Sequence, residues 1–241
     1  MTFAVSLSGA GLAVDGHSIL RDVELHLAPG EFVCVVGGSG CGKSSLLNVV
    51  SGLDAPTAGR VRVPGGRPAL MFQEHALFPW LTAGGNIEFA LGLRGVPRPE
   101  WRAEAEELLR LVRLPDAYGR RVHEMSGGMR QRVALARALA QGSDVLLMDE
   151  PFAALDAITR DVLHEELTRV WGERKLTVLF VTHNVREAVR LGQRVVLMAG
   201  SPGRIVRAWD VGIPYPRPAD DAEVSALAGE ITRRLREEIG E

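Results

Sequence analysis

The chain has 241 residues, of which 46% are hydrophobic, and it carries a formal net charge of -2. This composition can bury a sizeable core and excludes a disordered polymer. Because the molecule offers no basic field of the kind that non-specific nucleic-acid binders need, we expect no nucleic acid among its partners. The apolar runs are strand-sized, and none approaches the ~20 residues that cross a bilayer, so the chain is not expected to span a membrane.

The start of the chain and its cysteines indicate a cytosolic protein. The N-terminal segment Met-Thr-Phe-Ala-Val has neither a basic start nor a long apolar run, so the sequence predicts no secretory signal. Cys34 and Cys41 are too few for a disulfide framework and fit a reducing compartment. We expect a single domain spanning residues 1–241.

The first part of the predicted core, residues 1–73, contains a strand, a glycine loop and a helix in succession. Phe32 to Val36 has the pattern of a buried strand, and Ser45 to Val50 reads as the first turns of a helix. The loop between them fits the pattern Gly, four residues, Gly-Lys-Ser, for which about two chance matches in a thousand such chains are expected. Its candidate phosphate-binding residues are Gly37, Gly38, Ser39, Gly40, Cys41, Gly42, Lys43, Ser44 and Ser45.

This loop has the chemistry of a triphosphate site. Backbone N–H groups of glycines can curl round an anion, and the helix N-terminus adds partial positive charge. Lys43 would meet the β- and γ-phosphates of ATP, and Ser44 would supply a hydroxyl to Mg²⁺. Of the 28 basic residues only Lys43 and Lys175 are lysines, and a slim ammonium fits a tight loop that a planar guanidinium would not enter. At this helix N-terminus we also expect Cys41 to have a thiolate character.

Residues 74–141 are predicted to form an inserted helical lobe. Trp101, Ala105, Leu108, Leu109 and Val112 recur at helical spacing, after a start near Pro99-Glu100. Two consecutive glycines at 84–85 interrupt a segment where continuous helix is expected.

A second candidate anion cradle lies within this lobe. Ser126 is a good N-cap, and Gly127 and Gly128 leave backbone N–H groups uncovered at the tip of a predicted helix. Its buried stripe is formed by Met129, Val133, Ala136 and Ala140. One nucleotide can use both cradles only if the fold brings them together or a second subunit supplies one of them.

The remaining part of the core, residues 142–241, is predicted to alternate short strands with helices, which indicates a mostly parallel α/β sheet. The buried strand Val145 to Met148 ends directly at Asp149 and Glu150. At the carboxyl end of a parallel strand, Asp149 can reach Mg²⁺ and Glu150 can polarise the water that attacks the γ-phosphate. An acidic pair at a strand end is otherwise often a solvated cap.

Taken together, these motifs resemble those of the ATP-binding-cassette (ABC) transporter ATPases. Ser126-Gly127-Gly128, followed by Arg-Gln-Arg-Val-Ala-Leu-Ala-Arg-Ala-Leu, is similar to the family's signature motif. Gln73 resembles the Q-loop, Asp156 the D-loop and His183 the switch histidine, all in the family's order. The resemblance implies a P-loop NTPase fold with an antiparallel N-terminal β subdomain and a helical subdomain.

The resemblance also implies roles for single residues. Two cassettes would sandwich two ATP molecules, so that the glycine loop of one faces Ser126–Gly128 of the other, with Asp156 nearby. Gln73 would touch Mg²⁺ and water, and His183 would contact the γ-phosphate. At the position of the family's adenine-stacking aromatic residue this chain has Val14, so we expect weaker stacking on the base.

The partners implied are a second ATPase subunit, a permease and, indirectly, a periplasmic or lipoprotein solute-binding protein. The aromatic segment Leu77–Thr82 is the expected permease contact, unless its aromatic residues belong to the core of the lobe. The longer segment Gln73–Thr82, with Met129, resembles that of importers of nitrate, sulfonate, taurine and similar small anions, which work at the cytoplasmic face of the inner membrane. The alternatives are a soluble mechanochemical ATPase, an exporter subunit and a catalytically silent scaffold.

Overall fold

The computed structural model describes residues 3–239. The strands are β1 (Val5–Val14), β2 (His17–Leu27), β3 (Phe32–Gly37), β4 (Ala58–Arg62), β5 (Ala69–Met71), β6 (Val145–Asp149), β7 (Thr177–Thr182), β8 (Arg194–Ala199) and β9 (Arg204–Asp210). The helices are α1 (Lys43–Ser51), α2 (Ala83–Arg94), α3 (Trp101–Leu111), α4 (Gly127–Leu139), α5 (Ala157–Arg174), α6 (Val185–Leu191) and α7 (Ala222–Ile239). Two short 3-10 turns, η1 (Arg98–Glu100) and η2 (Val122–Glu124), complete the set.

The centre of the molecule is a six-stranded sheet in the order β5-β6-β7-β3-β8-β9. All neighbouring pairs are parallel except β8 with β9, which is antiparallel. The strands β3 and β7 are buried along their whole length. Continuous apolar runs such as these are typical of parallel strands covered on both faces, and the predicted mostly parallel α/β sheet is confirmed.

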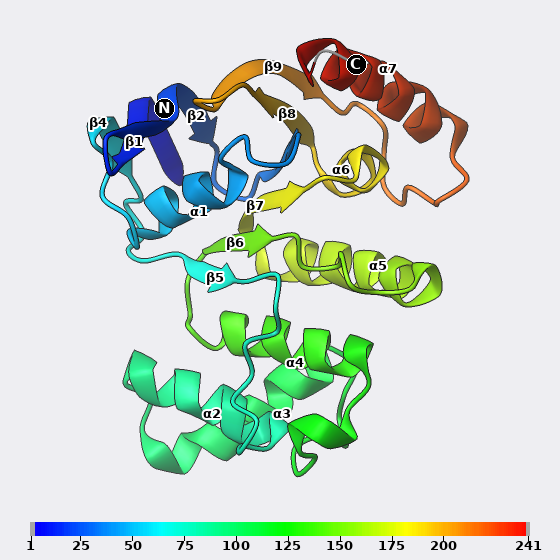
Figure 1. Cartoon of the computed structure of the whole chain (residues 1–241). Helices are drawn as coiled ribbons and strands as arrows, with labels where there is room; N and C mark the ends of the chain where they lie inside the picture. Colours follow the sequence, from blue (N-terminus) through cyan, green and yellow to red (C-terminus); the bar gives the residue numbers. More distant parts are fainter. Residues whose placement is uncertain (1–2, 240–241) are drawn as a thin grey trace.

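A smaller antiparallel sheet, in the order β2-β1-β4, lies beside α1 (Figure 1). The side chains of β3 alternate between two hydrophobic cores, because successive residues of a strand point to opposite faces. Val33 and Val35 pack with α1 and the small sheet, whereas Phe32, Cys34 and Val36 pack in the core that the other helices share. The expected antiparallel N-terminal sheet is thus confirmed.

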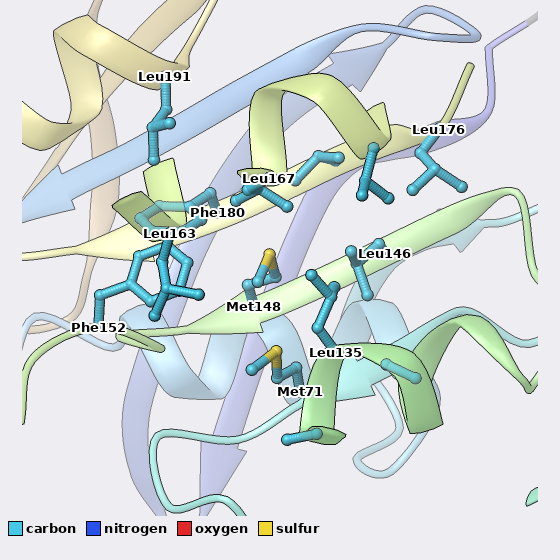
Figure 2. Packing of buried hydrophobic residues seen from close by; sticks show 14 of the residues in the cluster. Met71, Leu135, Leu146, Met148, Phe152, Leu163, Leu167, Leu176, Phe180 and Leu191 are labelled. Carbon is cyan, nitrogen blue, oxygen red and sulfur yellow. The ribbon is translucent and has the colours of Figure 1, made fainter. Parts of the chain in front are cut away.

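The second core fills the space between the sheet and α4 and α5. Met148 of β6 and Phe180 of β7 lie among Leu135 of α4 and Leu163 and Leu167 of α5 (Figure 2). This packing holds β6 and β7 in place against the two helices. The carboxyl ends of these two strands carry the candidate catalytic residues.

Helices α2, α3 and α4 gather at one end of the molecule, beyond β5 and α5 (Figure 1). The predicted stripe on α3 is confirmed, since Ala105, Leu108, Leu109 and Val112 are buried and Trp101 packs against the same core. At the opposite end, α7 covers the sheet through Val224 and Ile231, which are fully buried. Among the residues described, no helix has both the length and the apolarity needed to cross a bilayer.

The two glycines at 84–85 lie inside the first turn of α2, where Thr82 is the N-cap and accepts a hydrogen bond from the Gly85 N–H at 3.0 Å. The helix expected here is continuous through both glycines, and packing explains the first of them. A Cβ atom at position 84 would lie 2.4 Å from the ring of Tyr118. The ring therefore packs directly on the helix backbone.

We expect Gly84→Ala to lower the free energy of unfolding by about 1–3 kcal/mol, because the methyl group would displace a packed aromatic ring. Gly85→Ala is the matched control, since its Cβ would have no neighbour closer than 3.4 Å. Its stability should stay within about 1 kcal/mol of the wild type. Urea denaturation of both variants measures the difference, and equal stabilities would contradict this explanation.

Candidate functional site

The glycine loop connects β3 to α1 and exposes backbone N–H groups at the start of that helix. Gly40 and Gly42 adopt positive φ angles of 77° and 92°, which favour glycine. Gly42 is also the N-cap of α1 and carries no side chain that could cover the first N–H groups. These groups and the helix dipole point to the same place, which is the arrangement that binds phosphate.

Lys43 is 93% buried, and its ammonium group turns back over the loop. Its Nζ donates hydrogen bonds to the carbonyl oxygens of Gly37 at 3.0 Å and Gly38 at 2.8 Å. The positive charge therefore lies at the start of the loop, within reach of an anion bound at the N-terminus of α1.

The expected thiolate character of Cys41 is wrong. Only 6% of this residue is exposed, and burial raises the pKa of its thiol. The charge of Lys43 and a backbone N–H of the loop act in the opposite direction but do not outweigh the loss of solvent. The side chain points into the protein, against the backbone of Gly37, rather than into the loop.

Asp149 ends β6 and Glu150 follows it, at the sheet edge on which the glycine loop also lies. Burial raises the pKa of the Asp149 carboxyl, Glu150 raises it further, and a hydrogen bond with Ser44 together with the charge of Lys43 lowers it. The Ser44 hydroxyl, in the first turn of α1, is therefore close enough to act on the Asp149 carboxyl. Glu150 has a φ of 42°, a conformation that non-glycine residues rarely adopt outside functional turns.

His183 lies beyond the end of β7, the strand next to β6. Its Nδ1 is 2.8 Å from Oε2 of Glu150, and its side chain is 63% exposed. The parallel register explains why Glu150 and His183 lie together. Asp149 of β6 pairs with Val181 of β7, so the segments that follow the two strands leave the sheet side by side.

One cavity of about 430 Å³ unites the glycine loop with Glu150 and His183, whereas Asp149 is not among the residues that line it. Its walls are formed by Ile19, Ser39, Gly40, Gly42, Lys43, Ser44, Ser45, Glu150 and His183. The structure thus brings the glycine loop, a carboxylate and a histidine together around a space open to solvent.

Other residues predicted for the site lie outside these walls. Gln73 is exposed just after β5, whose carboxyl end is beside that of β6. Val14 is half exposed at the end of β1. Ser126 is the N-cap of α4, as predicted, and its Oγ accepts a hydrogen bond from the Met129 N–H at 3.3 Å. Gly127 and Gly128 begin that helix.

Asp156 is the N-cap of α5 and accepts a hydrogen bond from the Thr159 N–H at 2.9 Å. This hydrogen bond lowers the pKa of the Asp156 carboxyl. The helix that it caps also contacts the tip of α4, since a Cβ atom at Gly128 would lie 2.6 Å from the methyl group of Thr159.

Sequence reasoning missed the polar contacts of α4 with the segments around the site. Gln131, almost fully buried, donates to the carbonyl oxygen of Pro151 and pairs with the ring of His75. Arg137 donates to the carbonyl oxygens of His75 and Ala76. In the sequence, these contacts are indicated only by polar residues within a tightly packed helix. Such residues do not by themselves indicate which groups they contact.

The comparisons with known proteins agree with this geometry. The sequence model of the family described as "ABC transporter" matches residues 20–153. The chain belongs to the ABC transporter family. It is an ATP-binding subunit of that family, and an ATPase.

The names of two relatives of this ABC subunit describe import. The taurine import ATP-binding protein TauB of Mesorhizobium japonicum is 49% identical over 197 residues, which cover 79% of this chain and 77% of the relative. The aliphatic sulfonates import ATP-binding protein SsuB of Bacillus licheniformis is 45% identical over 207 residues, covering 83% and 80%. Among solved structures, the dimeric structure of the ABC transporter cassette MJ0796 has a TM-score of 0.74 at 30% identity, covering 87% of this chain and all of the other.

We expect Lys43→Arg in this ABC subunit to weaken ATP binding by at least about ten-fold, or 1.4 kcal/mol, because a guanidinium is too broad for the space between the Gly37 and Gly38 carbonyl groups. Lys175→Arg is the matched control, since it replaces the other lysine, which is exposed at the end of α5. Calorimetric titration with ATP measures both affinities. Equal affinities in the two variants would contradict the fit inferred for Lys43.

Proposed function

We propose that this ABC ATPase works as a pair of identical subunits that powers the import of a small anion through a partner permease. The observation that carries the pairing is the position of Ser126. The glycine loop, Glu150 and His183 surround one cavity, whereas the N–H groups at the tip of α4 lie outside its walls. A second copy, placed head to tail, would bring its Ser126–Gly128 to the triphosphate and would complete the site.

In this proposal the two strand-end carboxylates and His183 divide the work of hydrolysis. Glu150 polarises the attacking water, and His183, held by Glu150, contacts the γ-phosphate. Lys43 and the loop N–H groups bind the β- and γ-phosphates. Asp156 lies at the interface between the two copies, and the adenine rests near Val14 without an aromatic partner.

Mg²⁺ fits the oxygen donors present. The Ser44 hydroxyl lies close enough to the Asp149 carboxylate to lower its pKa, and Gln73 follows β5, the strand next to that of Asp149. Few protein oxygens together with phosphate oxygens are the usual ligands of Mg²⁺ beside a nucleotide, where the ion neutralises developing charge.

The permease contact is proposed at the segment Leu77–Thr82. Trp80 is 68% exposed, and Phe78 packs edge-on against Phe89 with ring centroids 4.8 Å apart. Beside them lies a groove of about 640 Å³, whose apolar walls include Phe72, Phe89 and Leu93. An exposed aromatic groove supports docking of a partner helix better than it supports a closed lobe core.

The remaining assignments follow from this contact. Residues 74–141 would act as a helical lobe that moves with the permease, between the core segments 1–73 and 142–241. The subunit would lie at the cytoplasmic face of the inner membrane, and a solute-binding protein would deliver the cargo from the other side. The names of the two import relatives favour taurine, another sulfonate or a similar anion such as nitrate.

The pairing is tested with Glu150→Gln, which should bind MgATP but not hydrolyse it. We expect this variant to run as a dimer in size-exclusion chromatography with light scattering when Mg²⁺ and ATP are both present, and as a monomer when either is absent. The double variant with Lys43→Ala is the control and should stay monomeric. A Glu150→Gln variant that binds ATP yet remains monomeric would contradict the proposed pair.

The transport role is tested with the membrane partner in place. We expect a permease to co-purify with the tagged chain from solubilised membranes, and Trp80→Ala to reduce that recovery at unchanged ATP affinity. In vesicles with the solute-binding protein, taurine, an alkanesulfonate or nitrate should stimulate hydrolysis. Import would be contradicted if a permease is recovered but hydrolysis by the complex is stimulated only by a substrate that moves outward.

A further inference from the structure

Three polar side chains lie buried directly behind His183. Thr182 ends β7, His164 belongs to α5 and Glu187 to α6, and none is more than 5% exposed. Burying such groups costs free energy unless each finds hydrogen-bond partners. An all-apolar cluster would fill the same space, so their presence calls for a specific explanation.

Hydrogen bonds join the three residues in one chain. Oε1 of Glu187 accepts from Nε2 of His164 at 2.7 Å, and Oε2 accepts from the Thr182 hydroxyl. The same hydroxyl oxygen accepts from the Asn184 N–H at 3.0 Å, on the far side of His183. The two backbone neighbours of His183 are therefore tied to one buried carboxylate.

At the other end of this series of hydrogen bonds, His164 contacts the segment that follows Glu150. The His164 ring packs against Phe152, with centroids 5.4 Å apart, and Phe152 packs against Phe180 of β7 at 5.8 Å. Phe152 and Phe180 lie close together beside Leu163 in Figure 2. Nδ1 of His164 is buried without a hydrogen-bond partner among the described residues, so Nε2 is the ring nitrogen that donates to Glu187.

We propose that Thr182, Glu187 and His164 are positioning residues, which together hold the turn of His183 so that its ring meets Glu150 and the γ-phosphate. The proposal rests on the role proposed above for His183. Directional hydrogen bonds fix an orientation that apolar packing would leave loose, and a displacement of about 1 Å can cost up to 100-fold in rate. The His183 ring, 63% exposed, has only Glu150 as a hydrogen-bond partner of its own among the described residues, so its backbone must supply the constraint.

The test compares Thr182→Val with Thr182→Ser. Valine has the shape of threonine without the hydroxyl, whereas serine keeps the hydroxyl and loses only a methyl group. We expect Thr182→Val to lower kcat for MgATP hydrolysis by about 10- to 100-fold, while the KM and the calorimetric Kd for ATP stay within about two-fold. Thr182→Ser should keep most of the activity. His164→Leu and His164→Gln form a second pair, in which glutamine can still donate to Glu187, and they serve if Thr182→Val fails to fold.

His183→Ala separates this proposal from the one on which it rests. A low kcat in His183→Ala with normal kcat in folded Thr182→Val and His164→Leu overturns the positioning role alone. Unchanged hydrolysis in His183→Ala overturns the proposed role of His183 and the positioning role with it. If Thr182→Val and Thr182→Ser both lost kcat and ATP affinity to the same extent, the effect would be purely structural. That result would also overturn the proposal.

Discussion

The path of the glycine loop is the constraint on which the rest of the site depends, and the surrounding backbone sets it. A Cβ atom at Gly37 would lie 2.2 Å from the carbonyl oxygen of Met198, and one at Gly203 would lie 1.9 Å from that of Cys41. At Gly42 it would lie 2.8 Å from Leu20. The loop is therefore packed between the end of β8, the turn that follows it and β2, and its shape is set without a nucleotide. A preformed ring of N–H donors costs little reorganisation when an anion binds, which suits a site that must bind ATP repeatedly.

The parallel sheet then places the reacting groups around that loop. Because β3, β6 and β7 are neighbours and run in one direction, their carboxyl ends bring Lys43, Asp149, Glu150 and His183 to one edge. Helix α4 does not join this group. Its buried Gln131 links it to Pro151 and His75, beside the site, while its tip remains outside the cavity walls. This separation is the physical reason for seeking the second half of the site in another copy of the chain.

The parts of this arrangement that follow from local patterns could be predicted from the sequence. The apolar run Val145 to Met148 predicts β6, and Ser126 as an N-cap predicts the start of α4; both agree with the structure. Long-range packing could not be predicted. The position of Gly84 inside a helix depends on Tyr118, 34 residues away along the chain. Likewise, the local dipole argument for Cys41 failed because the direction of its side chain, and hence its burial, is set by tertiary contacts.

The head-to-tail pairing of two copies is tested most directly by cross-linking across the proposed interface. Ser39 of the glycine loop and Ser126 are both exposed, and each can be replaced by cysteine in the Glu150→Gln background, where the native Cys34 and Cys41 are buried. We expect mixed Ser39→Cys and Ser126→Cys chains to form a covalent dimer on oxidation only when MgATP is present, and neither variant to do so alone. Two results would contradict the account. One is a cross-link between two Ser39→Cys chains, and the other is the absence of any cross-link in a mixture that dimerises with MgATP.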